Sequence, residues 1–382
     1  MKIGIEGTPF FGNLTGVGQY SSRLINAAQK LSRDEDFEIV KQWWFFRKFN
    51  PPIMPSKHLR YRLIKWFPPI FYYQLFKRTG WAPPYDLVAL RKYDIFLFFN
   101  YVAFPLRKGT KSLVTIYDLS FVYHPEFTHD KNVKYMPRFV PSSIRKSDHV
   151  ITISENSKRE IMEYYKVPED KITILNPAID HAIFKPQGQN SVAEITKKYD
   201  ISKPYILSVC TLEPRKNLVG VLNAFEKLPE DLKNNYSLVL VGGKGWIDGD
   251  IEAKYAQLAS EYDLIKTGYV PDEDLPALYS GASVFVYPAF YEGFGMPPLE
   301  AMACGTPVIT SDNTSLPEVV GNAGIMIKAD DTEQLARETE RVLTNNKLAQ
   351  NLREKGLAQA KKFSWDKSAK KFLDVIEEVG RK

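Results

Sequence analysis

Short apolar segments alternate with helical patterns along the chain, and this alternation constrains the fold more than any other feature. A first series of apolar segments lies at residues 2–6, 94–99, 112–116, 149–153 and 171–175. A second series lies at residues 205–209, 237–241, 264–267, 284–287 and 307–310. Strands separated by helices form parallel sheets. We therefore predict an α/β protein with two Rossmann-like, doubly wound domains that face each other across a cleft, with ligands at the carboxyl ends of the strands.

Length and a short linker pattern set the predicted domain boundaries. The 382 residues exceed the size at which one hydrophobic core stops growing. Residues 184–189 contain Pro186 and Gly188 and are typical of a linker. We predict a first domain at residues 1–185, a second at 186–363, and a C-terminal helix at 364–382 that crosses back to the first domain. Ser154 and the segment Asp272-Glu-Asp274 are expected to cap the helices that follow them.

Cysteine content and hydropathy bear on the compartment. The two cysteines, Cys210 and Cys304, exclude a disulfide scaffold and a Cys-based zinc site, and they fit a reducing compartment. No apolar stretch reaches the roughly 18 residues of a membrane span, and the first residues do not resemble a signal peptide. We therefore expect a cytoplasmic protein that is soluble or peripherally bound to a membrane.

Residues 41–85 differ from the rest of the chain in charge and aromatic content. They contain nine Lys or Arg residues, fourteen aromatic residues and no Asp or Glu. Basic and aromatic side chains together favour an anionic membrane surface or a lipid phosphate. The alternative is that the aromatic residues fill the core of the first domain. Binding to nucleic acid is disfavoured, since no RNA-binding motif accompanies the segment and seven prolines interrupt it.

The segment from Tyr287 to Ile309 carries the strongest motif. A predicted strand ends at Tyr287, a glycine-containing loop carries Glu292, and a helix with Glu300 then runs from near Pro297 to Gly305. Free backbone N–H groups at a helix start hold anions. Two carboxylates beside such a loop suit a ligand that has both hydroxyls and phosphates. The alternative is a structural turn followed by a helix with an ordinary exposed Glu.

This segment resembles the signature of retaining glycosyltransferases of family 4, which have the GT-B fold. Their Glu-x7-Glu motif is matched almost position by position by E-G-F-G-M-P-P-L-E-A-M-A-C-G-T-P-V-I. The resemblance implies that Glu292 and the loop residues Gly293, Phe294, Gly295 and Met296 face the donor sugar. It also implies that Glu300 binds the ribose of the donor nucleotide.

Further segments extend the resemblance through the chain. In Glu213-Pro-Arg215-Lys216-Asn217, the family's Arg and Lys pair with the donor diphosphate, whose leaving group gains negative charge in the transition state. Family members have Gly where this chain has Cys210. The loop containing Gly16 and Val17 resembles one whose amides meet the donor phosphate.

Two other segments of the resemblance concern the sugar and the base. Tyr117-Asp118-Leu occupies the place of the family's H-D-L, so Tyr117 replaces a His that contacts the donor sugar, and Asp118 aligns the acceptor or the sugar. A buried structural Asp is the competing interpretation of Asp118. The segment Gly268, Tyr269 and Val270 resembles one that lines the nucleobase, with a simple strand-to-loop turn as the alternative.

The resemblance implies a hexosyltransferase that uses a nucleotide-sugar donor and needs no metal or other cofactor. GDP-mannose is the first expectation, with UDP-glucose and related donors open. The acceptor would be a glycan or a lipid-linked oligosaccharide in polysaccharide or lipopolysaccharide assembly, at the inner face of the cell membrane. The Asp248-Gly-Asp250 spacing is interpreted as an acidic loop and not as a metal site. Rival hypotheses are a nucleotide-sugar epimerase, hydrolase or phosphorylase on the same fold, and a non-catalytic, membrane-docked binder.

Overall fold

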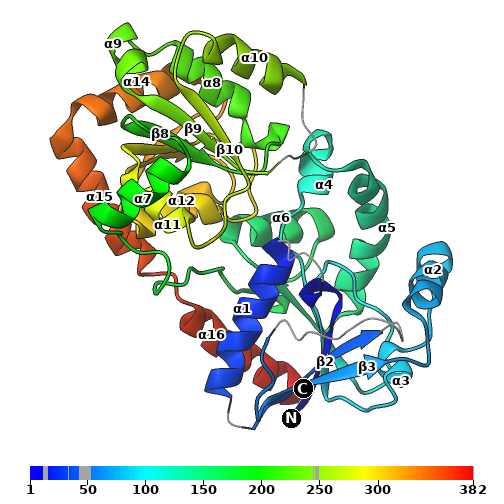
Figure 1. The fold of residues 1–382 in the computed structure, drawn as a ribbon. Coiled ribbons are helices and arrows are strands. Elements are labelled where there is room, and N and C mark those ends of the chain that lie inside the picture. The colour runs from blue at the N-terminus through cyan, green and yellow to red at the C-terminus, as the bar shows by residue number, and fades with distance from the viewer. Residues whose placement is uncertain (12–15, 33, 43–52, 244, 246–248, 382) are drawn as a thin grey trace. The chain divides into compact units, whose positions relative to one another are not determined.

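The computed structural model describes residues 1–11, 16–32, 34–42, 53–243, 245 and 249–381 (Figure 1). The chain divides into two compact units. Unit 1 is Met1–Pro177 together with Trp365–Lys382, and unit 2 is Ala178–Ser364. Each unit contains one parallel sheet connected through helices. The prediction of two parallel-sheet α/β domains is confirmed.

The described part of unit 1 contains a seven-stranded sheet with the order β3-β2-β1-β4-β5-β6-β7, and all of its pairings are parallel. The strands are β1 (Lys2–Glu6), β2 (Asp36–Gln42), β3 (Leu59–Ile64), β4 (Ile95–Phe98), β5 (Lys111–Thr115), β6 (His149–Thr152) and β7 (Ile172–Ile174). The strand order reverses between β1 and β4, which is where ligands bind in doubly wound sheets. The sequence patterns did not predict β2 or β3, because charged residues interrupt both strands and most residues of β3 are exposed or half-buried.

The C-terminal helix belongs to unit 1 and packs against its first helix. The helices are α1 (Gly16–Leu31), α2 (Pro69–Thr79), α3 (Tyr85–Val88), α4 (Ser120–Tyr123), α5 (Asp130–Lys146), α6 (Glu155–Tyr165) and α16 (Trp365–Arg381). Trp365 of α16 contacts the ring of Tyr20 on α1, and Phe372 stacks on Phe37 with ring centroids 6.5 Å apart. These apolar contacts explain why the last helix, with its one-sided apolar stripe, lies with unit 1.

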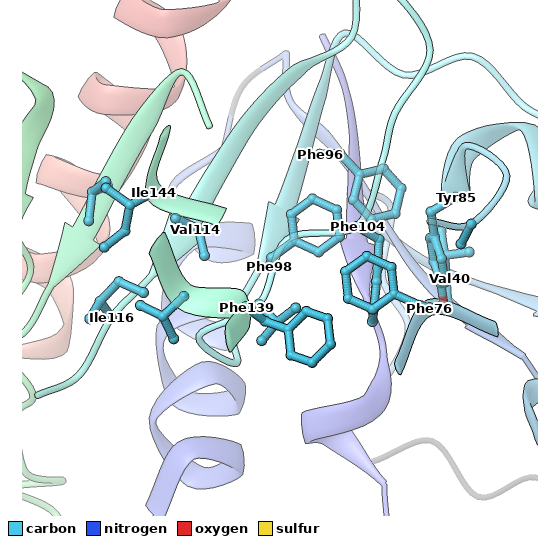
Figure 2. Close-up of a cluster of buried hydrophobic side chains, with 14 of the residues drawn as sticks. Val40, Phe76, Tyr85, Phe96, Phe98, Phe104, Val114, Ile116, Phe139 and Ile144 are labelled. Carbon is cyan, nitrogen blue, oxygen red and sulfur yellow. Dashed lines mark hydrogen bonds between the residues drawn. The ribbon is translucent and has the colours of Figure 1, made fainter. Parts of the chain in front are cut away.

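The aromatic residues of segment 41–85 divide between the core and the surface. Tyr72, Phe76 and Tyr85 are buried in a cluster with Phe96 and Phe104 (Figure 2). By contrast, Trp66, Phe71 and Trp81 are exposed. Part of the segment, including Trp43, Trp44, Phe45, Phe46, Arg47 and Lys48, lies outside the described residues. Some aromatic side chains of this segment therefore fill the core of unit 1, and others are exposed on its surface.

The described part of unit 2 contains a six-stranded parallel sheet with the order β10-β9-β8-β11-β12-β13. Its strands are β8 (Tyr205–Val209), β9 (Ser237–Val241), β10 (Leu264–Gly268), β11 (Val284–Tyr287), β12 (Val308–Ser311) and β13 (Ile325–Ile327). Its helices are α7 (Gln189–Lys198), α8 (Leu218–Glu226), α9 (Glu230–Asn235), α10 (Gly249–Ala259), α11 (Leu275–Gly281), α12 (Met296–Ala303), α13 (Leu316–Val320), α14 (Thr332–Thr344) and α15 (Asn346–Ala360). The order reverses between β8 and β11, so their carboxyl ends form the switch point of this sheet.

The helix cap predicted at Ser154 forms, whereas the side chain of Asp274 bonds elsewhere. The Ser154 hydroxyl accepts a hydrogen bond from the Ser157 N–H at the start of α6, as predicted. Asp274 precedes α11, but its side chain makes no capping bond. Instead, the Asp274 carboxylate accepts hydrogen bonds from Lys198 and the Tyr199 hydroxyl, each at 2.6 Å, so the capping prediction is wrong for Asp274.

Candidate active site

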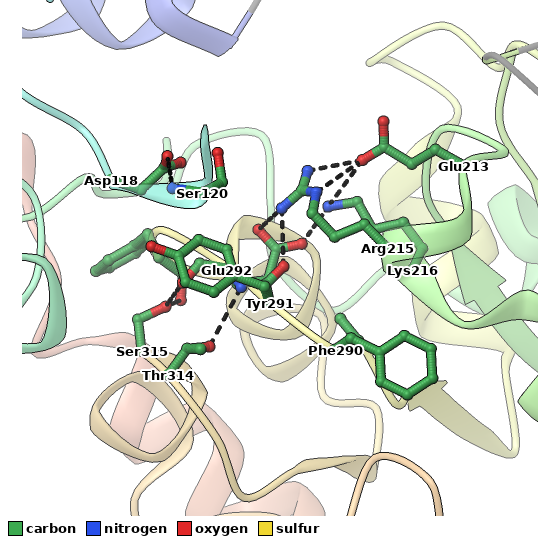
Figure 3. Close-up of polar contacts among 12 residues, drawn as sticks. Asp118, Ser120, Glu213, Arg215, Lys216, Phe290, Tyr291, Glu292, Thr314 and Ser315 are labelled. Atoms are coloured by element: carbon green, nitrogen blue, oxygen red, sulfur yellow. Dashed lines mark hydrogen bonds and ion pairs between the residues drawn. The ribbon is translucent and has the colours of Figure 1, made fainter. Parts of the chain in front are cut away.

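The candidate site lies at the ends of two neighbouring strands in unit 2. β8 and β11 pair in register through Ile206 with Val284 and Leu207 with Phe285, so the loops that follow them begin side by side. The first loop carries Arg215 in a 3₁₀ turn, Pro214–Lys216. The two loops are joined directly, since Phe290 N–H donates to the Arg215 carbonyl at 2.9 Å and Arg215 Nη1 donates to the Tyr291 carbonyl at 2.8 Å (Figure 3).

A buried ion pair joins the two predicted motifs. Lys216 Nζ donates to Glu292 Oε1 and also to the Tyr287 hydroxyl at 2.9 Å, while the Tyr287 hydroxyl donates to Glu292 Oε1 at 2.6 Å. Lys216 is 9% exposed and Glu292 8% exposed. Burial alone would raise the pKa of Glu292, but the charges of Lys216 and Arg215 outweigh it and lower this pKa to about 2. Glu292 is therefore a carboxylate at neutral pH.

A second carboxylate, Glu213, completes the cluster. Its Oε1 accepts hydrogen bonds from Arg215 Nε at 3.1 Å and Arg215 Nη2 at 2.7 Å. Arg215 Nη1 also lies 3.4 Å from Glu292 Oε2. Two cations and two carboxylates thus contact one another at the switch point. The contacts of Glu213 and Tyr287 were not predicted from the sequence, although Glu213 lies in the same motif as Arg215 and Lys216, and Tyr287 ends an otherwise apolar strand.

The loop that carries Glu292 is held by polar side chains that follow β12. Ser315 Oγ donates to the carbonyls of Glu292 and Phe294 at 2.9 and 2.8 Å, and Thr314 Oγ1 accepts from the Glu292 N–H. Gly295, before α12, has φ +112, and a Cβ there would lie 2.7 Å from a Leu316 methyl group. These constraints fix the loop's backbone. Neither Thr314 nor Ser315 was predicted from the sequence to belong to the site.

The other residues of unit 2 that were predicted to bind the donor lie in the loop after Glu292, on α12 and at the end of β10. Phe294 is buried against Phe363, with ring centroids 5.7 Å apart, and Gly293 is buried beside it. Met296 is the first residue of α12, and Glu300, further along it, accepts a hydrogen bond from the buried Tyr279 hydroxyl at 3.0 Å.

Gly268 ends β10 with φ +74, and it is followed by Tyr269, which is 75% exposed, and the buried Val270. β9 separates β10 from β8, so these residues lie two strands away from the strand before Arg215.

The predicted residues of unit 1 lie at the start of α1 and after β5. Gly16 is exposed and begins α1 with Val17, whereas residues 12–15 of that loop lie outside the described residues. Tyr117 is buried, and its hydroxyl donates to the Phe99 carbonyl at 2.8 Å. Asp118 accepts from the Ser120 N–H at 3.0 Å. Burial and the charge of Asp118 raise the pKa of the neighbouring Tyr101.

Comparison with known proteins decides the family. A model described as Glycosyltransferase Family 4 matches residues 15–183, and one described as Glycosyl transferases group 1 matches residues 192–359. O-antigen chain mannosyltransferase B of Escherichia coli is 32% identical over 377 residues, which cover 96% of this chain and 97% of the relative. The chain is a family 4 glycosyltransferase. The family resemblance predicted from the sequence is therefore confirmed.

Solved structures place the glycosyltransferase in the GT-B fold. Sucrose-phosphate synthase from Thermosynechococcus elongatus has a TM-score of 0.74 at 20% identity, covering 99% of this chain and 98% of that chain. Anabaena Alr3699/HepE in complex with UDP-glucose has a TM-score of 0.73 at 13% identity, covering 99% of this chain and 100% of that chain. At these identities the likeness shows the fold alone, and it confirms the predicted GT-B class.

The charged cluster places two cations, Arg215 and Lys216, beside the ionised carboxylate of Glu292, which accepts hydrogen bonds. Fixed cations stabilise the negative charge that develops on a leaving phosphate. A carboxylate with a pKa of about 2 accepts hydrogen bonds from hydroxyls and does not supply a proton at neutral pH. Burial raises the pKa of the nearby Cys210 thiol to about 12, so this thiol is neutral at the same pH.

Two further properties concern metals and membranes. Within the residues that the structure describes, no three His, Cys, Asp or Glu side chains are grouped so that they could hold a metal ion. Asp248 of the acidic pair considered above is not among those residues. In the same described ranges, no helix combines the length and the apolar character needed to cross a bilayer.

Proposed function

We propose that this glycosyltransferase transfers mannose from GDP-mannose, with retention of configuration, to a hydroxyl of a glycan or lipid-linked acceptor. The observation that carries the proposal is the contact of Lys216 and Arg215 with Glu292 at the carboxyl ends of β8 and β11. The choice of mannose is supported by the name of the Escherichia coli relative.

In this proposal, the protein works by positioning and electrostatics. Arg215 and Lys216 neutralise the leaving diphosphate, and Glu292 orients the sugar hydroxyls. The leaving phosphate oxygen takes the proton of the acceptor hydroxyl as the new glycosidic bond forms on the same face of the sugar, so no protein nucleophile is needed. Glu300 would bind the ribose, with Gly268, Tyr269 and Val270 along the nucleobase.

Residues of unit 1 would complete donor binding and hold the acceptor. We assign Gly16 and Val17 to the donor phosphate, Tyr117 to the donor sugar, and Asp118 to alignment of the sugar or acceptor. For the acceptor, the relevant observation is a polar cluster at the end of β1, where that sheet reverses its order. There the buried Glu6 carboxylate accepts from the hydroxyls of Thr8 and Tyr73, at 2.5 and 3.0 Å.

A surface on and beside α2 supports peripheral docking at the inner, cytoplasmic face of the cell membrane. We define the α2 surface as the exposed apolar residues Trp66, Ile70, Phe71 and Trp81 with the exposed basic residues Lys65, Lys77 and Arg78. Phe71 is 66% exposed and Trp81 is 61% exposed. Aromatic rings at the water–lipid boundary and Lys or Arg beside anionic head groups are typical of peripheral membrane proteins.

The charge of the segment around α2 and the packing of its inner side both favour docking through the α2 surface. The only acidic residue between positions 53 and 92 is Asp86, which is buried and paired with Arg107 at 2.9 Å. No exposed carboxylate of that segment therefore opposes an anionic surface. On its inner side, α2 is fixed by the buried Tyr72 and by the Tyr73 hydroxyl on Glu6, which links the α2 surface to the polar cluster of β1.

Nucleotide release across a panel of GDP-, UDP- and ADP-sugars tests the proposed donor. We expect slow release of GDP from GDP-mannose by the wild type, and its loss in Lys216→Ala and Glu292→Ala. Lys227→Ala, which removes a surface lysine paired with Glu333, is the matched control and should release GDP at the wild-type rate. Release of UDP from UDP-glucose, with no release from the other sugars of the panel, would identify the donor as UDP-glucose and contradict the proposal of GDP-mannose. Binding of donor without transfer to any acceptor would favour a non-catalytic binder.

A further inference from the structure

Glu213 lies against both cations of the candidate site. Its Oε1 accepts from Arg215 Nε and Nη2, and it lies 3.9 Å from Lys216 Nζ. The side chain is 14% exposed, comparable with the 19% of Arg215 and the 10% of Lys216. Charge-assisted bonds to a guanidinium at these distances are among the stronger polar contacts in proteins.

We propose that Glu213 is a positioning residue that aligns Arg215 for the donor diphosphate and acts as a counter-charge to it. This inference rests on the proposed function, because it requires that Arg215 and Lys216 bind a diphosphate. It adds a residue that the family resemblance did not assign.

The alignment follows from contacts on two sides of the Arg215 guanidinium. Glu213 binds the Nε and Nη2 edge, and the Tyr291 carbonyl accepts from Nη1 at 2.8 Å. Because a guanidinium is planar and rigid, contacts at two edges define its plane. Glu213 is itself fixed at the start of the 3₁₀ turn, where its carbonyl accepts from the Lys216 N–H at 3.0 Å. Arg215 is thus oriented before any ligand arrives, which lowers the entropic cost of each encounter.

The role of Glu213 as a counter-charge follows from the charges of the residues that surround it. Arg215 and Lys216 face two carboxylates, Glu213 and Glu292, so the four formal charges cancel. Without Glu213 the cluster would carry one net positive charge beside the diphosphate. In a partly buried site, an added charge a few ångströms away strongly favours an anion. Glu213 therefore weakens binding of the nucleoside diphosphate product and assists its release.

Two variants separate charge from alignment. Glu213→Gln removes the charge, and we expect GDP to bind about tenfold more tightly by calorimetry, while kcat falls and the donor KM falls with it. Glu213→Asp keeps the charge but shortens the side chain, so GDP affinity should stay within about threefold of wild type while kcat falls about tenfold. Glu226→Gln removes a carboxylate at the end of α8 that pairs with Lys254 of α10, and it should leave the GDP affinity, kcat and donor KM unchanged.

The outcomes distinguish this inference from a structural role and from the proposed function. Melting temperatures of both Glu213 variants identify any that fail to fold. If the folded Glu213→Gln variant binds GDP no more tightly than wild type, the role of Glu213 as a counter-charge is refuted. If Glu213→Asp keeps the wild-type kcat, the role of Glu213 in aligning Arg215 is refuted. If the wild type binds neither GDP nor UDP, the proposed function itself fails before Glu213 is tested.

Discussion

Lys216 and Glu292 are separated by 76 residues in the sequence, yet they form a buried ion pair at the ends of two adjacent strands. The Tyr287 hydroxyl donates to Glu292 and accepts from Lys216, so the pair shares a third polar partner. A buried pair of charges tolerates the loss of one member poorly. The two motifs that the sequence presents separately therefore belong to one electrostatic unit.

Tyr287→Phe should lower both activity and stability. The change removes a buried hydroxyl that bonds both members of the ion pair, at a cost of about 1–3 kcal/mol in the free energy of unfolding. Because Glu292 and Lys216 lose a common support, we expect kcat to fall about tenfold. Tyr255→Phe, which removes a hydroxyl bonded to the Leu264 carbonyl, is the control. Equal kcat values for the two variants would contradict a role for Tyr287 at the site.

Glu292→Gln should reduce stability at neutral pH and have less effect in acid. The folded-state pKa of Glu292, about 2, lies below the unfolded value near 4.3, so its ionised form stabilises the fold above about pH 4.3. That contribution, at most about 3 kcal/mol, is lost as the pH falls toward 2. Urea titrations at pH 7, 5, 4 and 3 measure the free energy of unfolding of both proteins. The difference between wild type and variant should become smaller below pH 4.3. A difference that does not change with pH would contradict the lowered pKa of Glu292.

Ser315→Ala should weaken donor binding more than it slows catalysis. It removes the hydroxyl that binds the carbonyls of Glu292 and Phe294 and thereby loosens the loop beside α12. We expect the free energy of unfolding to fall by about 1–3 kcal/mol and the donor KM to rise several-fold. Ser260→Ala, at an exposed hydroxyl of unit 2, is the control. An unchanged KM in a folded Ser315→Ala would show that the loop is held by other contacts.

Changes to the α2 surface should weaken membrane binding and leave the fold intact. We expect Phe71→Ser combined with Lys77→Glu and Arg78→Glu to bind vesicles of phosphatidylglycerol at least about tenfold more weakly in sedimentation. Arg62 is a poorer target, because Glu38 already pairs with it at 3.0 Å. Lys347→Glu with Lys355→Glu reverses two exposed charges on α15 and serves as the control. Equal sedimentation of the two variants would refute docking through α2.

Most strands were predictable from sequence, including the edge strands β7 and β10, whereas β2, β3 and β13 were not. β8, β9 and β11 match the predicted segments residue for residue, because every residue in them is buried and nearly all of their side chains are apolar. β3 lies at the edge of its sheet, where Arg60 is exposed and Arg62 is half-buried, so no apolar run marks it. β13, also an edge strand, is only three residues long.

The candidate site shows a similar division. Arg215, Lys216 and Glu292 were identified because their motifs are local in sequence. The contacts of Tyr287 and Ser315 were not, because they depend on how the strands pair. Tyr287 contacts Lys216 where the paired strands β8 and β11 end, and Ser315, which follows β12, contacts the loop that carries Glu292. The position of Tyr117 was predicted, but the bond from its hydroxyl to the Phe99 carbonyl depends on tertiary packing.

A crystal structure of the protein with GDP bound tests the central claim most directly. The account predicts diphosphate oxygens within hydrogen-bonding distance of Lys216 Nζ and the Arg215 guanidinium, with a ribose hydroxyl on the Glu300 carboxylate. A GDP molecule whose diphosphate contacts neither Arg215 nor Lys216 would contradict the account.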